Sequence, residues 1–206
     1  WFKKRHDWEF KKEEIVYSPG TVHALNVAVR ALTKPGDGVI IQRPVYPPFT
    51  SSIEANGRTV VNNALKSDEE GYFSINFDDF EAKAKDENTK MFILCNPHNP
   101  TGRVFTKDEL RKLADICAEN DVLIIADEIH GDIVRRNQTF IPIAKAAPEH
   151  AEKIITFTAI NKTFNVAGLH CTNVIITNSE LRKTFNGVMG MHLPSPFTVS
   201  ALLSVY

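Results

Sequence analysis

Short apolar runs and helical patterns alternate along most of the chain. Runs rich in aliphatic and β-branched residues predict strands at 39–42, near 59–61, and at 91–95, 122–126, 154–158 and 172–177. Helical patterns lie between them: one ends near residue 32, others cover 46–55 and about 77–85, and two begin at 106 and 179. This alternation is typical of βαβ units, so we expect an α/β fold around a mostly parallel sheet.

Local signals mark where several helices begin. Thr106 and Glu109 form a capping box, and Ser179 is expected to cap the closing helix. Ser18-Pro19-Gly20 marks the entry to the first long helix. No repeat or low-complexity segment interrupts the pattern, which predicts one domain over residues 1–206.

Composition narrows the class of partner. The chain of 206 residues has 24 Lys plus Arg against 25 Asp plus Glu, so no net field favours nucleic acid or an anionic membrane. No apolar run is long enough to span a bilayer, and no leader is evident. Cys95, Cys117 and Cys171 are odd in number and widely spaced, which indicates a reducing compartment and a cytoplasmic protein. A small-molecule substrate or another protein chain is the expected partner.

The segments that follow three predicted strands carry most of the candidate chemistry. They are 96–102, 127–130 and 159–165. In open α/β sheets, ligands bind beyond the carboxyl ends of the strands. If the three strands are parallel neighbours, the amide of Asn99, the carboxylate of Asp127 and the amine of Lys162 converge on one crevice.

Those three groups suit a pyridine aldehyde. The Lys162 amine can form an imine with the aldehyde, and the Asp127 carboxylate can hold the ring nitrogen protonated. The Asn99 amide can donate to the ring phenolate oxygen. A protonated ring is the stronger electron sink, so the carboxylate sets the reactivity.

A phosphate on the same ligand would need an anion site. Gly20, Thr21 and Val22 at a helix start offer free backbone N–H groups and a hydroxyl. Tyr46, after Pro44-Val45, offers an aromatic face that can stack on the ring.

In this order and spacing, the motifs resemble the fold-type I aminotransferase superfamily, which depends on pyridoxal 5′-phosphate. The finer likeness is to its MalY/PatB-like cystathionine β-lyase branch. The motifs are Arg5-His6-Asp7-Trp8, Ser18-Pro19-Gly20, Pro44-Val45-Tyr46-Pro47-Pro48-Phe49, Cys95-Asn96-Pro97-His98-Asn99-Pro100-Thr101-Gly102, Asp127-Glu128-Ile129-His130 and Lys162-Thr163-Phe164-Asn165. The resemblance implies a three-layer α/β/α sandwich, the large domain of such an enzyme.

The resemblance also implies a role for each candidate residue. Lys162 is the expected Schiff-base lysine and proton carrier, Asp127 the partner of the ring nitrogen, and Asn99 the donor to the phenolate oxygen. Tyr46 is the expected stacking ring, and Gly20, Thr21 and Val22 are expected to line the phosphate. His130 stands where many aminotransferases have a Tyr that reaches the phenolate oxygen. No metal is implied.

Two positions depart from the superfamily pattern. Ala159 stands where many relatives have a phosphate-binding Ser, and His170 stands where many have a phosphate-binding Arg. We therefore expect the phosphate to be held less firmly, unless Thr158, Thr163 or a neighbouring subunit compensates.

Chain length is a further departure. Family chains are considerably longer, so residues 1–206 resemble the large domain alone, with the N-terminal segment and the C-terminal small domain missing. The residue that binds the substrate carboxylate has no candidate here. The superfamily resemblance implies a homodimer with its site near the interface.

Three functional hypotheses remain open. The first is a carbon–sulfur β-lyase that converts cystathionine or a related cysteine S-conjugate to pyruvate, ammonia and a thiol. The second is an aminotransferase, and the third is a non-catalytic or regulatory binding protein on the same fold, suggested by Ala159 and His170.

Each candidate residue also has a purely structural interpretation. Alone, Lys162 would be a solvated lysine, Asp127 a helix cap, Asn99 a turn residue and Tyr46 a packing group. A metal site built from Cys95, His98, Asp127, His130 and Asp132 is disfavoured, because no compact ligand spacing is present.

Overall fold

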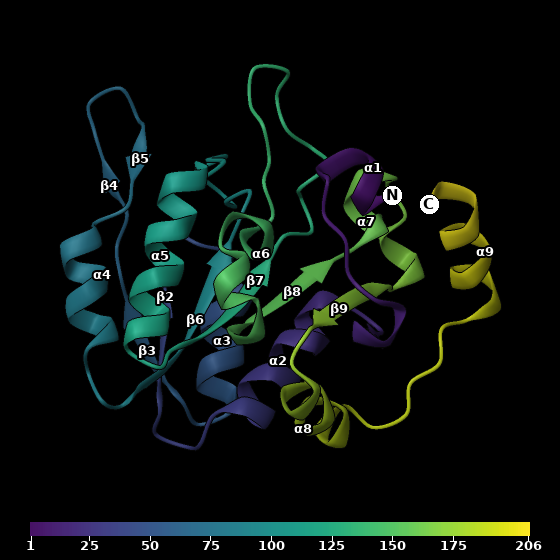
Figure 1. Ribbon diagram of the computed structural model, residues 1–206, viewed down its shortest axis with the longest axis horizontal. Helices are drawn as coiled ribbons and strands as arrows, with labels where there is room; N and C mark the ends of the chain where they lie inside the picture. Colours follow the sequence, from purple (N-terminus) through teal and green to yellow (C-terminus); the bar gives the residue numbers. More distant parts are fainter.

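A seven-stranded sheet forms the centre of the computed structural model, which describes residues 1–206 (Figure 1). Its order is β1-β9-β8-β7-β6-β2-β3. The strands are β1 (Ile15–Ser18), β2 (Gly38–Ile41), β3 (Thr59–Asn62), β6 (Thr89–Cys95), β7 (Leu123–Asp127), β8 (Ile154–Thr158) and β9 (Thr172–Ile176). Five strands, from β3 to β8, are parallel to one another, whereas β9 is antiparallel to β8 and β1 to β9. The expected mostly parallel sheet is confirmed.

Helices cover both faces of this sheet and make three layers. One face carries α2 (Thr21–Leu32), α3 (Pro47–Ala55) and α8 (Ser179–Met189), and the other carries α4 (Phe77–Ala84), α5 (Lys107–Glu119) and α6 (Ile143–Ala146). Alternate residues of β6 separate the two cores, since Ile93 packs into the first and Phe92 into the second. Burial on both faces explains why the strand sequences are apolar without alternation. The three-layer α/β/α sandwich is confirmed.

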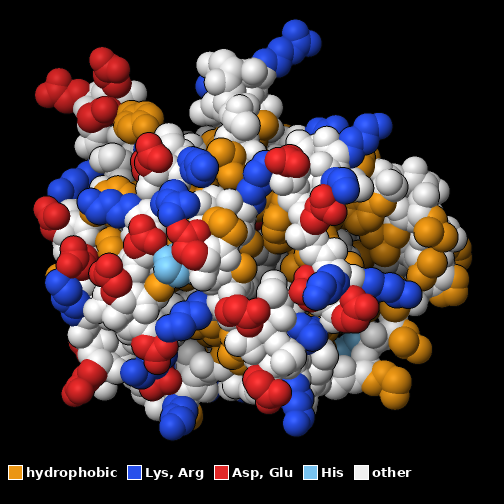
Figure 2. All heavy atoms as spheres, viewed as in Figure 1, with side chains coloured by type: hydrophobic (Ala, Val, Ile, Leu, Met, Phe, Trp, Pro, Cys, Tyr) orange, Lys and Arg blue, Asp and Glu red, His pale blue; other side chains and the backbone are white.

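The remaining elements lie around this sandwich. They are α1 (Phe2–His6), a 3-10 turn (Lys12–Glu14), the hairpin β4 (Lys66–Ser67) and β5 (Phe73–Ser74), a 3-10 turn (Pro148–Lys153), α7 (Ile160–Thr163), a 3-10 turn (Ala167–Leu169) and α9 (Pro196–Val205). Helix α9 stands at the edge of the molecule, where hydrophobic side chains gather on the surface (Figures 1 and 2). Phe197 and Leu203 of α9 are 79% and 81% exposed. No helix combines the length and apolar character required to cross a membrane.

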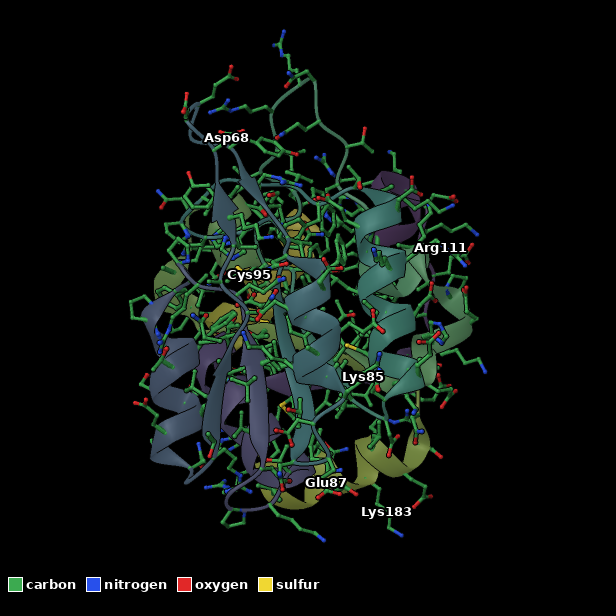
Figure 3. The ribbon with its side chains drawn as sticks, turned by 90° about the vertical axis from the view of Figure 1, so that its left-hand side faces the viewer. Asp68, Lys85, Glu87, Cys95, Arg111 and Lys183 are labelled. Carbon is green, nitrogen blue, oxygen red and sulfur yellow. The ribbon has the colours of Figure 1, made fainter.

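The parallel strands bring three chain segments to one edge. Cys95 at the end of β6 is in register with Asp127 at the end of β7, and Asp127 is in register with Phe157 of β8. In Figure 3, Glu87 before β6 lies at one end of the molecule and Asp68 of the β4–β5 hairpin at the other. The carboxyl ends of the strands therefore face the hairpin end, while Lys183 of α8 lies at the opposite end (Figure 3).

The helix starts agree with the sequence at α5 and differ at α8. Thr106 accepts a hydrogen bond from the backbone N–H of Glu109, and the Glu109 side chain accepts one from that of Thr106, so the capping box is confirmed. The expected cap Ser179 is wrong: the cap is Asn178, whose Oδ1 accepts from the N–H groups of Glu180 and Leu181 at 2.9 and 3.1 Å. Two adjacent residues of capping type made the pattern ambiguous by one position.

The cap assignment predicts unequal effects of two neighbouring substitutions. We expect Asn178→Ala to lower the free energy of unfolding by about 1 kcal/mol, because two N–H groups of α8 lose their acceptor. Ser179→Ala, one residue inside the helix, should change it by less than about 0.5 kcal/mol. Urea unfolding of both variants measures this difference, and equal losses would contradict the assignment.

Candidate active site

A cavity of about 380 Å³ opens where the carboxyl ends of β6, β7 and β8 meet the start of α2. Every residue proposed from the sequence lines it: Gly20, Thr21, Val22, Tyr46, Asn99, Asp127, His130 and Lys162. They come from five separate stretches of the chain. The amine, the carboxylate and the amide therefore face one space, although their individual roles remain predictions.

Asp127 is the buried acid of this cavity. It ends β7 with 6% of its surface exposed, and Oδ1 accepts one long hydrogen bond, 3.4 Å, from the N–H of Ile129. Burial raises the pKa of this carboxyl to about 7, against the lowering effects of that N–H and of the Lys162 charge. The carboxylate thus lacks a cationic partner in direct contact, and a cationic ligand group would stabilise its charged form.

The neighbouring acid, Glu128, has a different environment. Successive strand residues point to opposite faces, so Glu128 turns away from the cavity toward α6. Its Oε1 accepts a hydrogen bond from the N–H of Ile143 at 2.8 Å, and burial raises its pKa well above the ordinary value. Glu128 is therefore a packing and capping group rather than part of the cavity.

Lys162 reaches the cavity from α7, a single helical turn directly after β8. The residue is exposed, and its amine makes no hydrogen bond or ion pair within the protein. Its charge nevertheless acts on two cavity residues, since it opposes the rise in the pKa of Asp127 and adds to the lowering of the pKa of His130. For His130, burial is the larger cause of the lowering. A neutral imidazole at His130 is thus favoured beside the lysine.

Asn99 links two walls of the cavity through its main chain. Its carbonyl accepts from the N–H of Tyr46 at 3.1 Å, and its own N–H points to the Cys95 sulfur at 3.4 Å. The side-chain amide is left without a partner in the protein and lines the cavity. Tyr46, 40% exposed, directly precedes α3 and packs edge-on to Phe49.

The start of α2 provides an anion-binding geometry. Gly20 precedes the helix with φ 155° and ψ 156°, a conformation open essentially to glycine alone, and no side chain caps the helix. The N–H groups of the first turn are therefore free, and they carry the positive end of the helix dipole. A Cβ at Gly20 would meet no atom within 4 Å, so the space beside these N–H groups is open.

The two departures from the superfamily pattern lie in different places. His170 lines the cavity, with its backbone in the left-handed region at φ 42°, whereas Ala159 lies outside the cavity lining. Neither Thr158 nor Thr163 lines the cavity, and the Thr163 hydroxyl donates to Asp132 instead. The hydroxyl of Thr21 is hydrogen-bonded to that of Thr172 at 2.9 Å. The structure therefore does not support Thr158 or Thr163 as a replacement for the phosphate-binding Ser and Arg that are missing at positions 159 and 170.

His98 is part of the fold and not of the cavity. One ring nitrogen lies 3.2 Å from the carbonyl of Gln42 and the other 2.9 Å from the Thr101 hydroxyl. Burial lowers its pKa to about 4. Both nitrogens are occupied, which leaves no lone pair for a metal alongside Cys95.

Sequence reasoning missed several residues that line the cavity. His23, Leu25, Asn161 and Ala167 were not singled out at all, whereas Pro19, Pro48, Phe49, Cys95 and Ile129 stood in the motifs without a role in the cavity. His170 was noted only as a departure from the superfamily pattern. Asn161 is notable because its Oδ1 is buried without a hydrogen-bond partner. Its position beside Lys162 was the available signal, since adjacent residues on one helical turn share an environment.

Comparisons with known proteins agree with this geometry. The sequence model of the family described as aminotransferase class I and II matches residues 1–205. The chain is 40% identical to the cystathionine β-lyase PatB of Bacillus subtilis (strain 168) over 212 aligned positions, which cover 100% of this chain and 54% of that protein. It is 33% identical to the protein MalY of Escherichia coli (strain K12), covering 100% of this chain and 53% of MalY.

A solved structure is similar throughout the chain. Cystalysin from Treponema denticola, whose crystal structure contains pyridoxal 5′-phosphate, superposes with a TM-score of 0.94 at 40% identity, over 98% of this chain and 52% of that one. The chain thus spans about half the length of the relatives it matches. The family match extends over nearly every residue described, so the chain belongs to the aminotransferase class I and II family.

Proposed function

We propose that this chain carries the pyridoxal 5′-phosphate site of a carbon–sulfur β-lyase. Its substrate would be cystathionine or a related cysteine S-conjugate, and its products pyruvate, ammonia and a thiol. The observation that carries the proposal is the single cavity that combines the Lys162 amine, the buried Asp127 carboxylate and the Asn99 amide with a free helix start. The sequence likeness to a named cystathionine β-lyase supports this choice of reaction.

The residues present fit this cofactor. Buried Asp127 has no cation in contact, as expected for an acid that pairs with a protonated ring nitrogen. The free N–H groups at the start of α2 and the open space beside Gly20 suit a phosphate. Asn99 has an unpartnered amide to offer the ring oxygen, and Tyr46 offers an aromatic face.

When bound, pyridoxal 5′-phosphate supplies an electron sink for the pair left on the substrate Cα. Lys162 would hold the cofactor covalently at rest and, once its amine is released, remove the Cα proton. Asp127 would keep the nitrogen of the cofactor ring protonated. Asn99 would fix the orientation of the ring by a hydrogen bond to its phenolate oxygen. The thiolate then leaves from Cβ, and water completes the conversion to pyruvate and ammonia. His130, held neutral beside Lys162, can accept or donate a hydrogen bond in the same cavity.

A second candidate function is amino transfer. It is favoured by the family match and by similarity to a tyrosine aminotransferase of Caenorhabditis elegans, which is 32% identical over 185 aligned positions that cover 88% of this chain. In that reaction Lys162 would deliver the proton taken from Cα to a carbon of the cofactor, and no sulfur would be expelled.

We further propose a homodimer located in the cytoplasm. The exposed apolar side chains of α9 and the preceding loop, such as Leu193, Phe197 and Leu203, support a protein contact at this edge. Cys95, Cys117 and Cys171 are all free and buried, which is compatible with a reducing compartment.

Trapping tests the assignment of the lysine. Borohydride reduction of the cofactor-loaded full-length protein should fix the cofactor on Lys162, as peptide mapping would show. Lys162→Ala should lose this adduct and lower kcat by roughly 10²- to 10⁴-fold, because the proton carrier is removed. Lys183→Ala is the matched control, since this exposed lysine lies at the opposite end of the molecule (Figure 3). An adduct on another lysine would refute the assignment.

Product analysis distinguishes the reactions. With cystathionine as the sole substrate, the full-length protein should release pyruvate without any added keto acid. Amino transfer that depends on a keto acid, with no pyruvate from cystathionine alone, would favour the aminotransferase. Cofactor binding without turnover of either kind would favour the non-catalytic binding role.

The buried acid predicts a pH-dependent stability. The pKa of Asp127 in the folded chain is about 7 against an ordinary 3.8, so the folded state holds a proton that the unfolded chain releases. Stability without cofactor should therefore fall as pH rises from about 4 to about 7, by at most about 4 kcal/mol. Asp127→Asn has no carboxyl to ionise and should not show this fall in stability.

Urea unfolding at several pH values measures the effect. The Asp127→Asn variant should match the unsubstituted protein near pH 4 and exceed its stability above pH 7. Glu69→Gln, which removes an exposed carboxylate in the β4–β5 turn, serves as the control and should show no such window. A difference for Asp127→Asn that does not change with pH would contradict the raised pKa.

A further inference from the structure

Asp132 collects hydrogen-bond donors from separate parts of the chain although it lies outside the cavity lining. Trp1 Nε1 lies 3.2 Å from both carboxylate oxygens, and His6 Nε2 lies 2.8 Å from Oδ1. The Thr163 hydroxyl donates to Oδ2 at 3.2 Å, and Arg5 Nε is 3.4 Å from Oδ1. The Asp132 side chain is only 12% exposed. One carboxylate thus joins the N-terminal helix α1 to α7.

The charge of Asp132 is stabilised by these donors. Burial acts to raise its pKa, but the hydrogen bond and charge of His6, with the donors Trp1 and Thr163, outweigh burial and bring the pKa below its ordinary value. An ionised acceptor makes stronger hydrogen bonds than a neutral one.

Helix α7 needs such a contact to keep its position. It has four residues and no side-chain cap, and an isolated turn of this length is not stable in water. Ile160 anchors its start in the core, with 1% of its surface exposed. At its other end the Thr163 hydroxyl binds Asp132, and Phe164 packs edge-on to the Trp1 ring with centroids 5.4 Å apart. Lys162 lies between these two anchors.

The loop that bears Asp132 is itself fixed. Gly131 lies so close to Phe140 that a Cβ there would be 2.6 Å from the ring. The His6 ring packs perpendicular to the same Phe140 ring at 5.2 Å. His130, which lines the cavity, is two residues before Asp132. The contact between Asp132 and Thr163 therefore ties one cavity wall to the turn that carries Lys162. Figure 1 shows α1 beside α7, as these contacts require.

We propose that Asp132 is a positioning residue that holds the α7 turn, and with it Lys162, through the Thr163 hydroxyl, and that α1 is the brace that keeps Asp132 in place. The consequence for catalysis rests on the proposed function of Lys162. The structural part of the proposal does not, because the contacts are present in the protein alone.

Hydrogen exchange in the full-length protein, without cofactor and with pyridoxal 5′-phosphate, tests the structural part. The reporters are the amides of Phe164 and Val166, which bond to the carbonyls of Ile160 and Asn161. Thr163→Val should speed their exchange about five- to tenfold, the change expected from the net contribution of one ordinary hydrogen bond. Thr163→Ser, which keeps the hydroxyl, should restore the original rate.

Two Asp-to-Asn variants provide a matched pair. Asp132→Asn should speed exchange in α7 and also in α1, because its amide places a donor against Trp1 and Thr163. Asp121→Asn removes an exposed carboxylate that pairs with Lys153 and should leave both segments unchanged. Unchanged exchange at Phe164 and Val166 in both Thr163→Val and Asp132→Asn would overturn the proposal.

Kinetics of the loaded protein test the catalytic part. Thr163→Val should lower kcat about five- to tenfold with KM altered less than about twofold, and Thr163→Ser should recover kcat. If the adduct maps to Lys162 while exchange and kcat stay unchanged, the positioning role fails and the proposed function stands. If exchange responds while the adduct maps to another lysine, the proposed function fails and the structural tie stands.

Discussion

The burial of one carboxylate at the end of a central strand is the constraint on which this site depends. Asp127 ends β7, with strands on both sides, so its backbone is fixed by the sheet and its side chain has little freedom to reach water. The fold sustains an acid with a pKa raised to about 7 and no cation in contact. In its ionised form such an acid costs stability in the protein alone, and a cationic ligand group beside it would offset that cost.

The pleat of the same strand separates two acids that are adjacent in sequence. Asp127 faces the α2 side of the sheet and the cavity, whereas Glu128 faces α6 and accepts from the N–H of Ile143. Both carboxyl pKa values are raised by burial. Their hydrogen bonds differ in kind, because Glu128 serves a helix start and Asp127 has only the long contact to Ile129. Burial raises the pKa of both acids, and only Asp127 also borders the cavity, which is why it and not Glu128 is the candidate acid.

Much of the fold was predictable because its signals are local. The apolar strands, the capping box at Thr106 and the order of helices follow from runs and spacings a few residues long. Local signals failed for β1, whose four residues become more buried along the strand without alternating, and for the one-turn helix α7. Both depend on partners distant in the chain, β9 for the strand and Asp132 for the helix, and no short window contains them.

The candidate site was predictable to a similar degree for a related reason. Residues that directly follow parallel strands must share an edge, so Asn99, Asp127 and Lys162 could be placed together before their geometry was known. The neighbours that complete the cavity, such as His23 and Phe49, lie on helix faces set by packing. The donors around Asp132 leave no pattern in the sequence, and the orphaned oxygen of Asn161 is signalled only by its position beside Lys162.

The two candidate groups Asp127 and Lys162 have different kinds of structural support. Asp127 is held by the sheet itself, through backbone bonds such as that from the N–H of Asn96 to its carbonyl at 3.0 Å. Lys162 stands on a four-residue turn without a side-chain cap, and the Thr163 hydroxyl of this turn bonds to Asp132. If the proposed roles are right, the acid that holds a charge gains from a rigid strand, and the amine that binds and releases the cofactor gains from a short turn that distant contacts hold in place.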